Sequence, residues 1–475
     1  MAQATFNSFV SVDELPARLR IAALLDHGLF GSLLVLLCLT AIPYGTSQPW
    51  WKALFICSVL LATIFAAFEF LLNGSTNVDG KRLVLPIFAM AGYAYLQTIS
   101  LGPGFESGVA VTSRTISADP YSTRFVAMQL VALALVMLLL YRYMRTKTRV
   151  RIVIHVVLGI AVISAVYGIL RQTVQRDTGF ILPVLRPGAG YGQFINKNHF
   201  AYLMEMAFGL AVGLLVSGAV KRQQGMVYVA LLLPIWTGLV LSNSRGGILA
   251  MFAQISLAIL LIGYLRHVIG DEDSRITRAA HSKAMRFATL AILILVVAIG
   301  TVWVGGDRLI TNFEATGSEF SSSSPASPEG VTRNEIWRAT LRTFAAHPIL
   351  GVGLGGYSVA ITAHHEGSGK MTPQEAHNEY LELLASGGIV GFAIGLWFAF
   401  EVFRVVRANL RSTSKFRAGV CFGAVLGIVA VAVHSFFDFG LHLLANALIF
   451  AVLIVMATEI PENAAHLKNG SEATD

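Results

Sequence analysis

Long apolar runs separated by short polar segments make up most of the chain. A helix needs about 20 apolar residues to cross the hydrocarbon core of a bilayer, and twelve runs approach that length. The predicted spans lie near 28–46, 50–72, 83–101, 123–141, 152–170, 198–219, 226–242, 246–264, 287–304, 383–403, 418–435 and 443–459. In the tenth span, Gly387, Gly388 and Gly391 predict a kink or close helix packing. The pattern predicts an all-α, polytopic integral membrane protein.

The same pattern divides the chain into five parts. We expect an N-terminal segment (1–27), nine spans (28–304), a long loop with amphipathic helices (305–382), three more spans (383–459) and a tail (460–475). Lys and Arg orient such spans, because positively charged loops stay in the cytoplasm. With the N-terminus inside, 22 of the 35 Lys and Arg residues fall on the cytoplasmic side. Both termini are therefore expected in the cytoplasm, and the 305–382 loop in the periplasm of a bacterial inner membrane.

The composition agrees with a chain that lies mostly in lipid. Charged residues make 13% of it and hydrophobic residues 55%, whereas soluble domains carry about 25% charged residues. A soluble enzyme, a disordered tail protein and an ordinary nucleic-acid binder are therefore excluded. The net charge of +8 mainly reflects topology. The three cysteines fall in apolar runs and have no metal-binding spacing, so neither a disulfide framework nor a cysteine metal site is expected.

The long loop contains a predicted amphipathic helix. The segment from Thr332 to Glu335 has the form of a capping box, and a helix from about 333 to 346 should follow it. One predicted packed stripe holds Arg333, Trp337, Thr340, Leu341 and Phe344, while Arg338 and Arg342 lie opposite. Arg333 on a packed stripe needs an anionic partner. That partner is either a substrate or an ordinary structural carboxylate.

A second capping box, from Thr372 to Glu375, places Pro373 at the first position of a helix that runs into the tenth span. His377 and Asn378 then lie one turn later, just above the membrane surface. Imidazole suits proton transfer near neutral pH, so His377 is a candidate general base. The alternative is a histidine with a purely structural hydrogen bond.

Other polar residues stand at the outer ends of spans. Arg245, in the sequence SNSRGG, lies nearly at membrane depth, where a charge is costly and usually functional; simple snorkelling to the interface is the alternative. Further candidates for binding sugar hydroxyls or phosphate, or for merely capping the sixth span, are Asn196, Lys197, Asn198, His199, Arg171 and Arg186.

His434, Asp438 and His442 are spaced like a metal-binding face on one helix. However, the sequence FFDFG between them predicts that the helix is interrupted there. We therefore expect hydrogen bonds between helices and no bound metal. His434 and Asp438 remain candidates for contact with the substrate, as do Trp337 and Asn378.

Several ordered stretches resemble the O-antigen ligase/polymerase superfamily. His377-Asn378, nine residues and then GIVG match its H-[NSQ]-x9-G-x-x-[GTY] pattern. The other similar stretches are GQFINKNHFAYLMEM (192–206), SNSRGG (242–247), TRNEIWRATLRTFAAHPILGVGLGGYS (332–358) and HSFFDFGLHLLANAL (434–448). Together they extend over more than half of the chain. They are specific for the superfamily but not for one activity within it.

The resemblance implies a metal-independent, inverting membrane glycosyltransferase without a cofactor. Its donor would be an oligosaccharide on undecaprenyl diphosphate in the outer leaflet. Motif by motif, Arg245 and Arg333 would bind the diphosphate and His377 would be the general base. Arginine can pair with such a leaving group in a bidentate manner, and stabilising the developing charge lowers the barrier. No nucleotide-binding P-loop sequence occurs.

Within the superfamily we favour a polymerase of O-antigen or exopolysaccharide repeat units, because the stretches NKNHFA and HSFFDF are more typical of polymerases. The chain also ends soon after the twelfth span, so we expect no soluble C-terminal domain. The alternatives are an O-antigen ligase that transfers glycan to lipid A-core, then a protein O-oligosaccharyltransferase, and last a twelve-span transporter. Expected partners are the lipid-linked donor, a glycan or lipid A-core acceptor, membrane lipid, a chain-length regulator and a flippase, but no nucleic acid.

Overall fold

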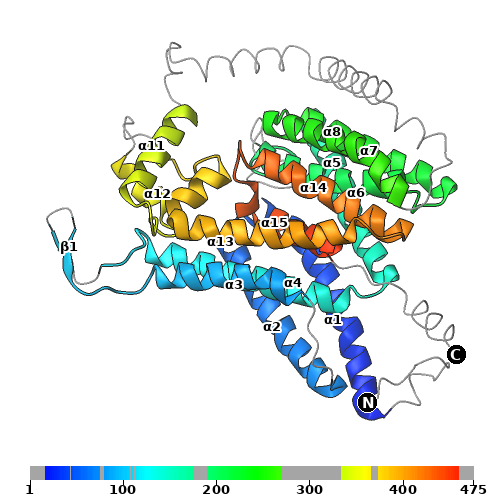
Figure 1. The fold of residues 1–475 in the computed structure, drawn as a ribbon, viewed down its shortest axis with the longest axis horizontal. Helices are drawn as coiled ribbons and strands as arrows, with labels where there is room; N and C mark the ends of the chain where they lie inside the picture. Colours follow the sequence, from blue (N-terminus) through cyan, green and yellow to red (C-terminus); the bar gives the residue numbers. More distant parts are fainter. Residues whose placement is uncertain are drawn as a thin grey trace.

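The computed structural model describes residues 16–42, 44–74, 80–106, 109–111, 114–174, 190–268, 333–364 and 373–458. These residues form a bundle of helices (Figure 1). The helices are α1 Ala17–Ala41, α2 Pro49–Asn73, α3 Lys81–Leu96, α4 Pro120–Tyr143, α5 Lys147–Val174, α6 Lys197–Val216, α7 Arg222–Leu241, α8 Arg245–Val268, α11 Arg333–Ala346, α12 Tyr357–Ala360, α13 Glu379–Asn409, α14 Lys415–His434 and α15 Leu444–Thr458. Short 3₁₀ turns are η2 Tyr44–Thr46, η3 Ile361–Ala363 and η4 Gly440–His442, and a small hairpin joins β1 Gly104–Glu106 to β2 Val109–Val111.

Nine helices of the described part are long and apolar enough to cross a membrane: α1, α2, α4, α5, α6, α7, α8, α13 and α14. The predicted third and twelfth spans coincide with α3 and α15, which have only 16 and 15 residues. The predicted ninth span, 287–304, and the tail, 460–475, lie outside the described residues. The prediction of a helical membrane protein is confirmed, while the count of twelve spans stays a prediction.

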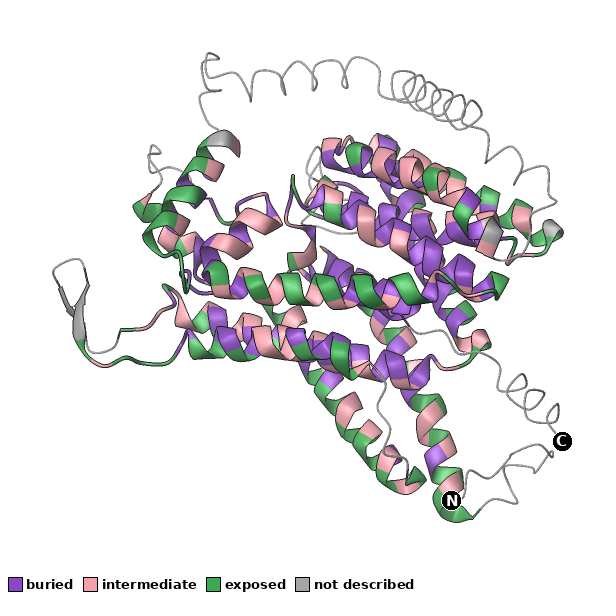
Figure 2. Ribbon diagram, in the orientation of Figure 1, coloured by how far each residue is buried: buried purple, intermediate pink, exposed green. Residues whose placement is uncertain are grey.

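Helices α6 and α14 form the centre of the bundle and contact each other closely. A Cβ atom added to Gly213 of α6 would lie 2.3 Å from the Cα atom of Gly423 in α14. Such small residues let two helix backbones approach without side chains between them. Figure 2 shows these central helices as largely buried, whereas the ends of α1 and α2 that extend from the bundle are mostly exposed.

Helix α13 is broken at Gly388, as the glycines of the tenth predicted span indicated. The backbone there has φ 61° and ψ −166°, a conformation that is almost restricted to glycine. Segment 347–353, which follows α11, fills the break with its own backbone. The amide of Ile389 donates to the carbonyl of Pro348 (2.9 Å), and the amide of Val352 donates to the carbonyl of Ala385 (3.1 Å). Segment 347–353 is therefore bonded to α13 on both sides of the break.

Side chains of α3 hold the same segment from the other side. Tyr93 donates its hydroxyl hydrogen bond to the carbonyl of Leu350 (2.8 Å), and the amide group of Gln97 donates to that carbonyl as well (2.7 Å). In Figure 1, α11 and α12 lie at the left end of the bundle, beside the first turns of α13. The contacts along 347–353 thus position α11 relative to the membrane helices.

The start of α13 differs from the sequence-based expectation. The helix predicted to begin at Pro373 begins at Glu379 instead, and Asn378 is its N-cap. The Asn378 side chain accepts hydrogen bonds from the amides of Tyr380 (3.1 Å) and Leu381 (3.0 Å), so this cap displaces the one predicted at Thr372, which lies outside the described residues. His377 precedes the cap with φ 51° and therefore does not lie on a helix.

The amphipathic helix at 333–346 is confirmed as α11, but its packed face is rotated from the predicted stripe. The buried positions are Ile336, Ala339, Thr340 and Thr343, whereas Leu341 is 48% exposed. Arg338 and Arg342 are exposed, as predicted. The packing of α11 on α13 and on the turn η3 selects this face, which an average helical period cannot specify.

Candidate functional site

Three helix N-termini meet where most of the predicted site residues lie. Asn196 caps α6 by accepting a hydrogen bond from the amide of Asn198 (2.9 Å). Ser244 precedes α8, and its hydroxyl accepts from the amide of Gly247 (3.2 Å). Asn378 caps α13. Because helix N-termini carry partial positive charge, this end of the bundle favours an anionic ligand. We call it the site end.

His377 pairs with Asp438 at the site end. Its Nδ1 atom lies 3.3 Å from Oδ1 of Asp438, which is long for a hydrogen bond but within the range of an ion pair. The His377 ring also packs edge-on against Phe439, with ring centroids 4.9 Å apart. The Asp438 side chain is fully buried, whereas that of His377 is 32% exposed. His377 thus combines access from outside with a buried carboxylate behind it.

The charge of Asp438 fixes how His377 can act. Burial alone would raise the pKa of this carboxyl, but the contact with His377 and the nearby rings of His199 and His434 hold the pKa well below its ordinary value. A charged Asp438 favours the His377 tautomer with its proton on Nδ1. The contact with Asp438 occupies Nδ1, so Nε2 is the ring nitrogen that could accept a proton in this tautomer.

The backbone next to His377 is held from both sides. The amide of Ala376 donates to Oε2 of Glu382 (2.7 Å), and the carbonyl of Ala376 accepts from the indole nitrogen of Trp337 (3.0 Å). Trp337, predicted to bind substrate, therefore holds the peptide that precedes His377. A non-glycine residue at positive φ carries backbone strain, and these two contacts stabilise the strained conformation.

Three cationic side chains gather beside this pair. Lys197 is the first residue of α6, Arg245 of α8 and Arg333 of α11. The charges of both arginines act on the Lys197 ammonium group, so the three stretches that the sequence singled out converge in space. Lys197 is exposed, and both arginines are half-buried. Such a cluster of cations suits a ligand with several negative charges, such as a phosphate or diphosphate.

Other predicted ligands have partners within the protein. Arg171 is only 4% exposed and donates to the carbonyl of Gly192 (3.0 Å). His199 is 8% exposed, and its ring packs edge-on against Phe439. The Asn198 side chain contacts Asp438 and Ser244. Arg186 lies outside the described residues.

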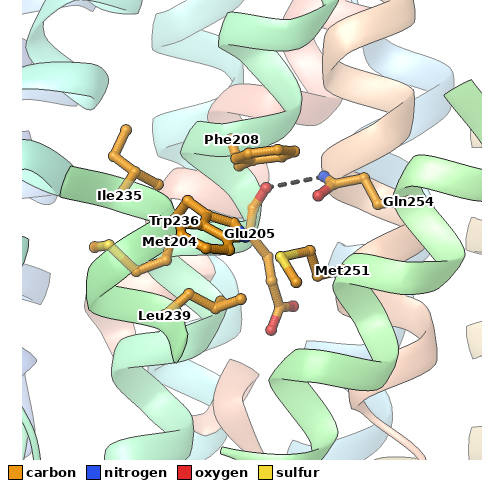
Figure 3. A pocket seen from close by; sticks show the side chains of 8 residues that line it. All are labelled: Met204, Glu205, Phe208, Ile235, Trp236, Leu239, Met251 and Gln254. Atoms are coloured by element: carbon orange, nitrogen blue, oxygen red, sulfur yellow. Dashed lines mark hydrogen bonds between the residues drawn. The ribbon is translucent and has the colours of Figure 1, made fainter. Parts of the chain in front are cut away.

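His434 lies deeper in the bundle, in a pair that the sequence did not indicate. Its Nδ1 atom lies 2.8 Å from Oε1 of Glu205, and both side chains are fully buried. Glu205 stands two turns of α6 beyond Asn198 and also lines a narrow, mainly apolar space between α6, α7 and α8 (Figure 3). Gln254 closes one side of this space by donating to the backbone carbonyl of Glu205 (2.9 Å). An acidic residue inside an apolar run was the signal that could have revealed the pair.

His442 belongs to a third group and is surrounded by carboxylates. Its Nδ1 atom lies 3.2 Å from Oε2 of Glu375 and 3.7 Å from Oε1 of Glu382, and its Nε2 atom lies 3.3 Å from Oε2 of Glu379. Burial would lower the pKa of His442, but the three carboxylates raise it well above its ordinary value. A protonated His442 therefore supplies positive charge to this cluster.

The metal-like spacing of His434, Asp438 and His442 does not produce a common site. Helix α14 ends at His434, as FFDFG predicted, so each of the three residues faces different partners. A different set in the described residues is compact enough to hold a metal ion. It consists of Glu375, Glu382 and His442, whose ligand atoms lie within 4.8 Å of one another.

The comparisons agree with the motifs quoted from the sequence. Among proteins of curated function, none matches this chain. Residues 229–396 match a family described as O-antigen ligase. The matched range includes Arg245, Arg333, His377 and the broken helix at Gly388, whereas Asn198 and Asp438 lie outside it. This match covers about a third of the chain and supports the resemblance to the O-antigen ligase/polymerase superfamily seen in the motifs.

Proposed function

We propose that this protein transfers a glycan from undecaprenyl diphosphate on the periplasmic side of the bacterial inner membrane, and that it polymerises O-antigen or exopolysaccharide repeat units. One observation carries the proposal. A histidine backed by a buried carboxylate, His377 with Asp438, stands beside the cations Lys197, Arg245 and Arg333 at the end of a membrane bundle. A base next to a polyanion site is what glycosyl transfer from a lipid diphosphate requires.

The proposed reaction divides the work between these two groups. The diphosphate lies against Lys197, Arg245 and Arg333, and the acceptor hydroxyl points at Nε2 of His377. As the hydroxyl oxygen attacks the anomeric carbon, its proton passes to Nε2. The bond between that carbon and the diphosphate oxygen breaks, and the diphosphate leaves with the electron pair. The cations stabilise this growing charge. Attack opposite the leaving group inverts the anomeric configuration.

Reconstitution tests the activity. The purified protein is mixed in lipid with undecaprenyl-diphosphate-linked repeat units and without nucleotide, and the glycans are separated by length. A ladder of chain lengths supports a polymerase. Transfer that requires added lipid A-core identifies a ligase, which the description of the matched family favours as the second candidate. Transfer only to added protein identifies an oligosaccharyltransferase, and glycan that crosses the membrane unaltered identifies a transporter.

Substitutions test the site within the same assay. His377→Ala and Arg333→Ala should each abolish most of the turnover. Arg338→Ala is the matched control, because Arg338 lies on α11 one turn from Arg333 but is exposed on its other face. Full turnover in His377→Ala and Arg333→Ala would disprove the site assignment, even if the ladder forms.

The orientation is proposed together with the activity. Both termini should lie in the cytoplasm, because the Lys- and Arg-rich loops gather on that side. A single cysteine placed at the exposed Arg338 should then react with a thiol reagent that does not cross the inner membrane. Protection of that cysteine in intact spheroplasts, with labelling only after lysis, would reverse the orientation.

A further inference from the structure

One ion pair followed by three hydrogen bonds joins His377 to the start of α8. Oδ1 of Asp438 faces His377, and its Oδ2 accepts a hydrogen bond from the side-chain amide nitrogen of Asn198. The amide oxygen of Asn198 accepts from the hydroxyl of Ser244 (2.8 Å). The Ser244 hydroxyl in turn accepts from the amide of Gly247 in the first turn of α8 (3.2 Å). Arg245 directly follows Ser244, so this series of contacts ends beside a residue that is proposed to bind the diphosphate.

The direction of every hydrogen bond in this series follows from the charge of Asp438. A carboxylate can only accept, so Asn198 must present its NH₂ group to Asp438 and its oxygen to Ser244. The Ser244 hydroxyl must then donate to Asn198, which leaves its oxygen lone pair to accept from Gly247. Asp438 and Ser244 are fully buried, so their side chains depend on these bonds within the protein. Neither Asn198 nor Ser244 can exchange its donor and acceptor roles without breaking another contact in this series.

We infer that Asn198 is a positioning residue that couples the His377–Asp438 pair to the N-terminus of α8, rather than a ligand for the substrate. This inference rests on the proposed function, because it assigns His377 the role of the base. Both ends of the Asn198 side chain are occupied by protein atoms. Its backbone amide is occupied by the N-cap Asn196. Asn198 thus orients Asp438, and through it His377, relative to the helix that begins with Arg245.

Two substitutions separate positioning from substrate binding. Asn198→Ala removes the donor to Asp438 and should lower kcat by about 10- to 100-fold, the range for losing a hydrogen bond to a charged group, with the donor KM nearly unchanged. Asn198→Asp keeps the size but places a second carboxylate against Asp438. Because two adjacent carboxylates share a proton, the acid limb of the pH–rate profile should move to higher pH.

A double-mutant cycle decides whether Asn198 acts through the base. In the His377→Ala background, Asn198→Ala should cause no further loss of turnover, because the group it positions is already absent. Asn409→Ala is the control: Asn409, the last residue of α13, is a buried asparagine whose side chain donates to the carbonyl of Ala457 near the end of α15. It should change thermal stability without moving the pH–rate profile.

The outcomes separate this inference from the proposed function. If Asn198→Ala multiplies the loss caused by His377→Ala, or raises only the donor KM, the inference is wrong and Asn198 binds substrate, as its sequence position suggested. An unmoved acid limb in Asn198→Asp would equally overturn it. If His377→Ala itself retains full turnover, the assignment of the base fails, and the inference falls with it.

Discussion

The broken helix α13 offers a sharp test of how the site end is assembled. Both glycines of the motif that follows His377 lie in α13, but their surroundings differ. A Cβ atom on Gly388 would lie 2.3 Å from the carbonyl oxygen of Ile349 and 2.6 Å from the amide nitrogen of Gly351. A Cβ atom on Gly391 would make only ordinary van der Waals contacts, with the Tyr93 ring at 3.5 Å and with Leu383 at 4.0 Å. The structure therefore predicts opposite results for two similar substitutions.

The magnitude follows from the backbone. The conformation at Gly388 is nearly restricted to glycine, and an alanine there costs about 1–3 kcal/mol in strain. The added methyl group also collides with backbone atoms, which cannot rotate away. If segment 347–353 moves to relieve the collision, the bonds from Ile389 to Pro348 and from Val352 to Ala385 are lost, at about 1 kcal/mol each. Gly388→Ala should therefore destabilise the protein by about 2–5 kcal/mol.

The assay compares unfolding of the two alanine variants by SDS titration in mixed micelles. Gly391→Ala should be neutral or more stable by up to about 1 kcal/mol, because alanine is the better helix former and its methyl group fits. Gly388→Ala should also lose glycan transfer, since the displaced segment carries α11 and Arg333 with it. Equal stability of the two variants would refute the reasoning, because it would mean that the contacts at Gly388 do not constrain the fold.

Three further predictions concern the charged groups. His442→Gln should destabilise the protein at low pH: the raised pKa of His442 gives a stabilising contribution that is complete below about pH 6.5 and is lost as pH rises through the raised value. Because the side chain is 39% exposed, solvent weakens the effect. A difference in thermal midpoint between His442→Gln and the unsubstituted protein that grows with pH would contradict this prediction. Asp438→Asn should lower kcat by a factor of about 10 or more at neutral pH, because it removes the charge that selects the His377 tautomer; an unchanged pH–rate profile would contradict this. Lys197→Met should raise the donor KM about tenfold and make it less dependent on salt, whereas Arg338→Met should leave it unchanged.

Most of the fold could be predicted from the sequence, because the length of an apolar run is a local property. Every predicted span within the described residues coincides with a helix, and α11 lies where the amphipathic pattern predicted it. The kink was also visible in advance, since glycines are the residues that permit it. The start of α13 could not be predicted, because the sequence offers two possible caps, at Thr372 and at Asn378. The choice between these caps depends on Glu382 and Trp337, whose side chains hold the backbone of Ala376. These two residues lie on different helices, and the hydrophobic pattern does not show that the helices meet.

The candidate site was predictable as a list of residues but not as a set of contacts. Arg245, Arg333 and Lys197 were chosen from separate stretches, and the structure brings their charges together. Their role as diphosphate ligands stays a prediction. Arg171 was chosen as a possible ligand for phosphate or sugar and His434 for its spacing with Asp438 and His442, yet both contact the protein itself. A polar residue at the end of a span looks the same in the sequence whether its partner is a substrate or a distant helix.

The buried pair of Glu205 and His434 has a consequence for how the protein is made. The two residues are 229 positions apart in the chain, so α6 enters the membrane long before α14 is synthesised. Until then Glu205 is an acidic residue in lipid without its partner, and an acidic side chain at a helix centre costs about 2.5–3.5 kcal/mol on insertion scales. Helix α6 is therefore expected to remain near the insertion machinery, or to hold a proton on Glu205, until α14 arrives. This fully buried contact would then be among the last to form during biogenesis.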